Sequence, residues 1–148
     1  MTQVPILNAL RIAALSTLLG IAGSHAMADV VAVVSPNNPA TTISKREVSN
    51  IFLGKTNRFP NGAPAVAIDQ REGSAPRVEF YLNVSNMQPA EIKAHWSKMI
   101  FTGRGQPPMT VDGDGDEQVK KALASRPDGI GYIDSAAVDD RVKVLAVE

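Results

Sequence analysis

The feature that most constrains the fold of this chain is the alternation of short apolar runs with segments of helical periodicity. Val30–Val34 is a continuous β-branched run that stops at Ser35, the pattern of a strand buried on both faces. A second apolar run covers residues 65–68, and two more strands are predicted over residues 128–134 and 142–147. Helical patterns separate these runs. The sequence therefore predicts an α/β fold with a mainly parallel sheet and helices on both of its faces.

The first helix is predicted to begin at Ser44 and to end before Gly54. Ser44 and Glu47 have the spacing of a capping box, in which each side chain bonds the backbone N–H of the other residue. Glycine commonly ends a helix because it adopts positive φ without strain. This helix is expected to bury one apolar face, made of Val48, Ile51 and Phe52.

Three later segments also have helical periodicity: one that follows residue 74, one over residues 89–101 and one over residues 116–126. Asp116 is expected to cap the last of them. His95 is expected to be a half-buried structural residue. The side chains expected to face the core are Val78, Tyr81 and Leu82 in the first segment, Ile92, Trp96, Met99 and Ile100 in the second, and Val119, Ala122 and Leu123 in the third.

The N-terminal segment is predicted to be a secretory signal peptide. It has one charge, Arg11, followed by an apolar run over residues 12–23 and by small residues at the end. Cleavage is expected after Ala28, with Ala26 as the other option, and an uncleaved anchor is the alternative interpretation. Residues 29–148 then form one domain of an exported, periplasmic protein.

Charge and composition exclude several classes of function. The 15 basic and 15 acidic residues of the chain balance, and removal of Arg11 leaves 14 against 15, so no basic excess favours nucleic acid. The chain has no cysteine, which excludes disulfides and thiolate chemistry. His95 is the single histidine after residue 28, which leaves no zinc site and no catalytic triad. We therefore expect a protein that is not an enzyme and has no metal or cofactor.

The loop between the second strand and the second helix is the candidate binding site. It places Arg71, Glu72, Gly73 and Ser74 where the helix opens. Helix openings expose unpaired N–H groups and a partial positive charge, so they suit anions. The alternative is that Ser74 only caps the helix.

Three stretches resemble one known family. They are IFLGKTNRF (51–59), DQREGSAPRVEFYL (69–82) and GDGDEQVKKALASRPDGIGYID (113–134). In order and spacing they are similar to motifs of the periplasmic phosphate-binding proteins of ABC importers, which have two lobes with phosphate between them. This chain has room for one lobe, so it resembles a short, single-lobe form of the type 2 periplasmic binding proteins.

The resemblance implies a ligand site in the loop, and it also marks departures from the family pattern. Ala75 stands where the family has glycine, and Pro76 stands where it has threonine. Proline has no N–H, so one backbone donor and one hydroxyl are lost from the anion site. The residues expected to bind the ligand are Asp69, Arg71, Glu72, Gly73, Ser74, Ala75 and Arg77.

Each charged residue of the loop has two interpretations. Arg71 and Arg77 are expected to bind an oxyanion through paired hydrogen bonds; the alternative is that either one pairs with Glu72 or Glu79 on the surface. Asp69 and Glu72 have two interpretations, acceptors of a proton from a protonated oxyanion or solvated loop carboxylates, and the second is favoured.

The aspartates of VDGDGDE (111–117) do not have the spacing of a calcium loop, and we interpret them as a solvated turn. FTGRGQPP (101–108) has two interpretations, a second anion-binding nest or a flexible connection. The predicted function is recognition of phosphate or a similar oxyanion, linked to phosphate import through a membrane transporter. The alternative is an interaction module without a ligand, which binds an envelope protein or a second copy of itself.

Overall fold

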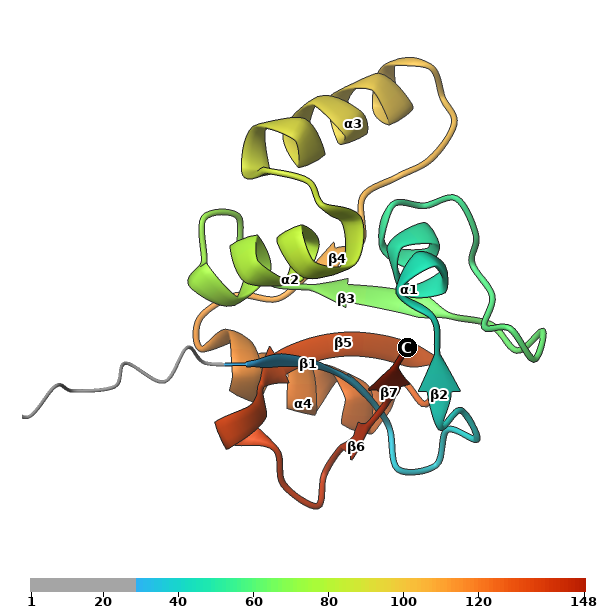
Figure 1. The fold of residues 1–148 in the computed structure, drawn as a ribbon, viewed down its shortest axis with the longest axis vertical. Helices are drawn as coiled ribbons and strands as arrows, with labels where there is room; N and C mark the ends of the chain where they lie inside the picture. Colours follow the sequence, from blue (N-terminus) through green and yellow to red (C-terminus); the bar gives the residue numbers. More distant parts are fainter. Residues whose placement is uncertain (1–28) are drawn as a thin grey trace, which may run out of the picture.

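The computed structural model describes residues 29–148, so the predicted signal peptide over residues 1–28 lies outside the described part of the chain (Figure 1). Strands and helices are interspersed along the described chain. The elements are β1 (Val30–Val34), β2 (Thr42–Ile43), α1 (Lys45–Phe52), β3 (Val66–Asp69), α2 (Ala75–Ser85), α3 (Pro89–Phe101), β4 (Met109–Thr110), α4 (Gly115–Ser125), β5 (Gly129–Asp134), a 3-10 turn (Ser135–Ala137), β6 (Lys143–Val144) and β7 (Ala146–Val147).

The central sheet has five strands in the order β4-β3-β5-β1-β6, and β2 and β7 form a separate parallel pair. β3 is parallel to both of its neighbours, whereas β1 is antiparallel to β5 and to β6. With the separate β2-β7 pair included, three of the five strand pairings are parallel, and the predicted fold class is confirmed. The antiparallel direction of β1, which pairs Val30 with Asp134 and Val34 with Ile130, was not predicted.

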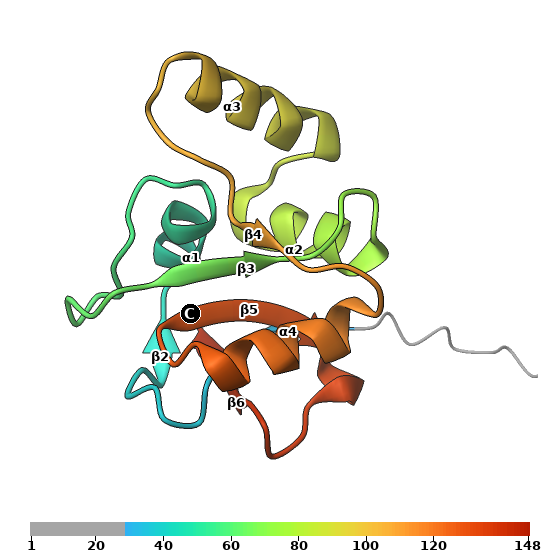
Figure 2. The same ribbon diagram turned by 180° about the vertical axis from the view of Figure 1, so that it is seen from behind.

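Helices cover both faces of this sheet. α1 and α2 lie on one face, and α4 lies on the opposite face (Figures 1 and 2). β1 contributes to both cores, because Val34 packs with α1 and α2 while Val33 packs with α4. The continuous β-branched run was predicted to be buried on both faces, and this is confirmed.

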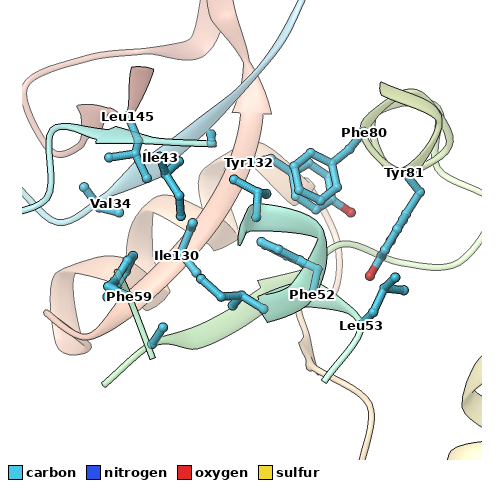
Figure 3. Packing of buried hydrophobic residues seen from close by; sticks show 14 of the residues in the cluster. Val34, Ile43, Phe52, Leu53, Phe59, Phe80, Tyr81, Ile130, Tyr132 and Leu145 are labelled. Atoms are coloured by element: carbon cyan, nitrogen blue, oxygen red, sulfur yellow. The ribbon is translucent and has the colours of Figure 1, made fainter. Parts of the chain in front are cut away.

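The capping box of α1 is present. Ser44 N–H donates to Glu47 Oε2 over 2.9 Å, and Glu47 N–H donates to Ser44 Oγ over 3.2 Å. These bonds lower the pKa of Glu47. The predicted face of α1 is buried, and Phe52 reaches an aromatic group in which the rings of Phe80 and Tyr132 stack with centroids 4.0 Å apart (Figure 3).

Several predictions about the later helices need correction. Asp114, not Asp116, is the N-cap of α4, because its side chain accepts the N–H of Glu117. α2 buries Phe80 and Tyr81 most deeply, since the helix presents these neighbours to the core. Ile100 was expected in the core and is 58% exposed.

α3 stands apart from the layered body (Figures 1 and 2). It is attached through Trp96, which is buried as predicted, and through His95, whose Nε2 lies 2.8 Å from the carbonyl oxygen of Leu53. Within residues 29–148, no helix is long and apolar enough to cross a bilayer.

Candidate functional site

The predicted loop lies at the carboxyl end of β3 and opens α2. Gly73 has a φ of +83°, and Ser74 N–H donates to the carbonyl oxygen of Arg71 over 3.1 Å, which closes a tight turn. Residues other than glycine rarely adopt such a φ, because their Cβ makes this backbone conformation unfavourable. Gly73 is therefore suited to this position. Arg71, Glu72 and Gly73 are exposed on the outside of the turn.

Asp69 precedes this turn and is almost fully buried, with 2% of its surface exposed. Its carboxylate accepts hydrogen bonds from Tyr81 Oη over 2.7 Å, from Tyr132 Oη over 2.5 Å and from the backbone N–H of Gln70 over 2.9 Å. The alternative that Asp69 is a solvated loop carboxylate is therefore wrong. Burial, and next the charge of Asp69, raise the pKa of both tyrosines well above the ordinary value, so both phenols stay protonated and act as donors.

Arg77 is anchored by the same carboxylate. Its Nε lies 3.3 Å from Asp69 Oδ2, and its guanidinium stacks over the Tyr81 ring at 5.1 Å from the centroid. Its side chain is 13% exposed, and within residues 29–148 no other hydrogen-bond partner of this guanidinium is present. The alternative of a surface pair with Glu72 or Glu79 is thus wrong for Arg77. The fixed guanidinium keeps its terminal nitrogens free for a ligand.

Ser74 occupies the N-cap position of α2, but its side chain makes no capping hydrogen bond. Its Oγ is buried and has no partner among the described residues. Buried hydroxyls are usually paired, so this hydroxyl is an unused hydrogen-bonding group at the helix opening. The alternative in which Ser74 serves as a helix cap does not describe this geometry.

Arg77 lines a cleft of about 380 Å³ between the loop and α3. Of the residues predicted to bind a ligand, Glu72 and Arg77 line this cleft, and Asp69 lies behind Arg77. Arg71, Gly73, Ser74 and Ala75 are not among the lining residues. The full lining is Gln70, Glu72, Arg77, Lys93, Trp96, Ser97, Ile100, Pro107 and Thr110.

The wall formed by α3 was missed in the sequence. Lys93, Ser97 and Ile100 are separated by four and then three residues, which places them on one face of a helix. That spacing was a usable signal, but only if the helix was known to lie over the loop. Nothing local in the sequence shows where α3 packs.

Gln70 was also missed, and it links the end of β3 to the first turn of α4 and to β5. Its side-chain Nε2 donates to Asp116 Oδ1 over 3.2 Å and to the Tyr132 carbonyl oxygen over 2.9 Å. A side chain at Gly115 would bring its Cβ within 2.2 Å of Gln70 Oε1, so glycine is required there while Gln70 keeps its place. The hydrogen bond from Gln70 occupies the Asp116 carboxylate, which therefore does not cap α4.

Comparison with known proteins identifies the architecture. No protein-family model and no curated protein matches this chain. Solved structures do match it. They include a phosphate ABC transporter substrate-binding protein from Clostridium perfringens, solved with bound phosphate, with a TM-score of 0.62 and 23% identity over 80% of this chain and 44% of that chain. An ABC-type phosphate transport receptor from Vibrio cholerae has a TM-score of 0.61 and 16% identity over 80% of this chain and 45% of that one.

This protein has the fold of one lobe of a periplasmic phosphate-binding protein. PstS from Borrelia burgdorferi is a further match, with a TM-score of 0.53 and 15% identity over 80% of this chain and 47% of that chain. The predicted resemblance is confirmed at the level of the fold. This chain spans less than half the length of these solved proteins.

The charges around the cleft of this lobe balance. Arg77 and Lys93 are cationic, whereas Asp69 and Glu72 are anionic. Lys93 Nζ and Glu72 Oε1 face each other at 4.0 Å, with both side chains largely exposed to water. An exposed pair of this kind contributes little, at most about 1 kcal/mol. A bound anion would therefore depend mainly on Arg77 and would be opposed by Glu72.

Proposed function

We propose that this protein is an exported solute-binding domain that recognises phosphate or a similar oxyanion at loop 69–77. The proposal includes a link to phosphate import through a membrane ABC transporter. It draws on the fold shared with phosphate-binding proteins and on the chemistry of the cleft. Export rests on the signal-peptide pattern over residues 1–28, and sequencing the N-terminus of the exported protein tests it. An intact Met1 would contradict it.

The observation that carries the proposal is the anchored position of Arg77. The buried Asp69 carboxylate and the Tyr81 ring hold the guanidinium at the cleft, so little conformational entropy is lost when a ligand binds. A guanidinium presents a rigid fork that matches the oxygens of phosphate and carboxylate. The adjacent opening of α2 adds a partial positive charge.

We expect weak binding. One lobe leaves a face of the anion in water, where Coulomb attraction is screened, and Pro76 removes one backbone donor. The net charge around the cleft is zero. A dissociation constant in the millimolar to high-micromolar range, about −4 to −6 kcal/mol, is expected. A partner subunit or a second copy would tighten binding by covering the open face.

Calorimetry with phosphate, sulfate and acetate tests the proposal. Arg77→Lys keeps a cation beside Asp69 but loses the paired hydrogen bonds, so we expect binding to weaken about tenfold, the equivalent of one such bond. Arg71→Lys, on the exposed part of the same loop, is the matched control. It should leave the affinity for all three anions unchanged. Pro76→Thr should strengthen binding. If neither wild type nor Pro76→Thr binds any of the three anions at millimolar concentrations, the proposal fails.

A second function is favoured by the apolar end of α3. Phe101 is 92% exposed and neighbours the exposed Ile100. Exposed apolar side chains that cluster can mark a contact with another protein. The alternative function is an interaction module that contacts an envelope protein or a second copy of this chain. Sedimentation analysis tests the second copy: self-association that Phe101→Ser abolishes would support it.

A further inference from the structure

We infer that the cleft between loop 70–77 and α3 takes an oxyanion that carries an apolar group, such as a short alkyl phosphate or carboxylate, in preference to inorganic phosphate. This inference rests on the proposed function and names the class of ligand for the same site. It follows from three properties of the cleft: its few free donors, its apolar wall and its volume.

The cleft offers few fixed donors to surround a free phosphate ion, because Lys93 is an exposed side chain that faces Glu72 and Thr110 adds a single hydroxyl. Inorganic phosphate is a mixture of its singly and doubly charged ions near neutral pH, and all four of its oxygens form hydrogen bonds. Gln70 lines the cleft, but its side-chain amide nitrogen already donates to Asp116 and to Tyr132. Ser97 Oγ donates to the carbonyl oxygen of its own helix at Lys93. The anchored guanidinium of Arg77 can therefore serve one side of an anion, and the other side meets different chemistry.

That other side is partly apolar, since Lys93 and Ser97 share it with three apolar residues. Trp96, Ile100 and Pro107 line the cleft opposite the charged loop. Trp96 is 6% exposed and is held where its ring lies against Gly54, so it forms a rigid wall. Its indole N–H is buried and has no partner among residues 29–148, so it is not a donor that a ligand in the cleft can reach. Ile100 remains 58% exposed beside it, and an apolar group that covered this side chain would remove it from water.

The volume agrees with an organic ligand. The cleft measures about 380 Å³, which falls within the range of about 300–1,000 Å³ typical of sites for organic molecules. An ester or carboxylate with a short alkyl group would place its oxyanion at Arg77 and its alkyl group between Trp96 and Ile100. A site of zero net charge should also accommodate the single negative charge of a carboxylate more easily than the double charge of a phosphate.

Calorimetry on the purified protein with five probes tests this inference: inorganic phosphate, n-butyl phosphate, acetate, butyrate and n-butanol. Each methylene buried contributes a factor of about four in affinity, so partial burial of the butyl group should make butyl phosphate bind about tenfold more tightly than phosphate. Butyrate should bind more tightly than acetate by a similar factor. Butanol, which lacks the oxyanion, should not bind.

Two variants on the same helix separate the cleft from the rest of α3. Ile100→Ser should remove the tenfold advantage of butyl phosphate and leave the affinity for inorganic phosphate unchanged. Phe101→Ser is the matched control, because Phe101 is more exposed and does not line the cleft. It should leave both affinities unchanged.

The outcomes distinguish this inference from the proposed function. If phosphate binds and butyl phosphate binds no more tightly, the inference is overturned and the proposed function stands. If the advantage of the butyl group survives Ile100→Ser, or if Phe101→Ser removes it equally, the assigned wall is wrong and the inference is overturned. If butanol binds as well as butyl phosphate, the oxyanion contributes nothing to the preference and the inference is overturned. If no oxyanion binds to wild type or to Pro76→Thr, both the inference and the proposed function fail.

Discussion

Replacing Arg77 with alanine should destabilise the whole domain, because Arg77 compensates a buried charge. Asp69 is 2% exposed, and the guanidinium of Arg77 is the one cation in contact with it among the described residues. Breaking a buried ion pair by removing one partner costs about 3–5 kcal/mol. Three neutral donors to Asp69 remain and Arg77 is partly exposed, so we expect the lower end of that range, about 3 kcal/mol.

Urea unfolding followed by far-UV circular dichroism and by the fluorescence of Trp96, the single tryptophan, measures this loss. With a slope of about 2 kcal/mol per molar urea, the midpoint should fall by about 1.5 M. Arg71→Ala is the matched control, since Arg71 is exposed and forms no ion pair among the described residues, and it should change stability by less than about 0.5 kcal/mol.

A double-mutant cycle with Asp69→Asn isolates the interaction. Once the buried charge is gone, removing Arg77 should cost less stability. The loss of unfolding free energy in the double variant should therefore be smaller than the two single losses added together, by at least about 1 kcal/mol. If Arg77→Ala is no more destabilising than Arg71→Ala, or if the two losses simply add, the reasoning that joins Arg77 to Asp69 is refuted. Arg77→Lys, which keeps the charge, is for this reason the variant suited to binding assays.

Three further predictions concern the same region. Above about pH 10 the free energy of unfolding should fall by about 1.4 kcal/mol per pH unit for each of Tyr81 and Tyr132, because their raised pKa keeps them protonated in the folded state while the unfolded chain releases those protons. Urea titrations across this pH range measure the slope, and a slope that Tyr132→Phe does not alter would count against this prediction. Gly115→Ala should cost about 1–3 kcal/mol, because the new Cβ would overlap the buried Gln70 side chain, and a thermal transition equal to that of wild type would show that Gln70 can move. Trp96→Ala should cost about 3–5 kcal/mol by circular dichroism, and a loss below about 1 kcal/mol would mean that the ring does not anchor α3.

Most of the fold could be predicted because its signals are local. The capping box of α1 links residues only three positions apart, and the alternation of apolar runs with helical segments needs no knowledge of distant contacts. The strand Val30–Val34 was assigned from its own composition. Its antiparallel direction was not, because direction depends on where the chain places β5, which is about 100 residues further on.

The candidate site was predicted only in part, and the errors have one cause. Loop 69–77 was located correctly at a strand end and a helix opening. Asp69, however, was weighed as a solvated carboxylate, whereas its donors come from Tyr81 and Tyr132, which lie 12 and 63 residues away. The same distance hid the wall formed by α3, since Lys93 and Ser97 look like surface residues of an isolated helix.

The sequence by itself determined which segments are helices and strands, which of their faces are apolar, and that an anion-compatible helix opening follows β3. Propensity, capping and periodicity act within a few residues, so they can be recognised in the linear chain. The tertiary structure alone decided which charges of the loop are available. Asp69 is buried, and its carboxylate holds the guanidinium of Arg77 in place. Trp96 packs against the body of the domain, so α3 lies next to the loop and forms a cleft with it. These outcomes depend on desolvation and on contacts between distant segments, which no local pattern in the sequence specifies.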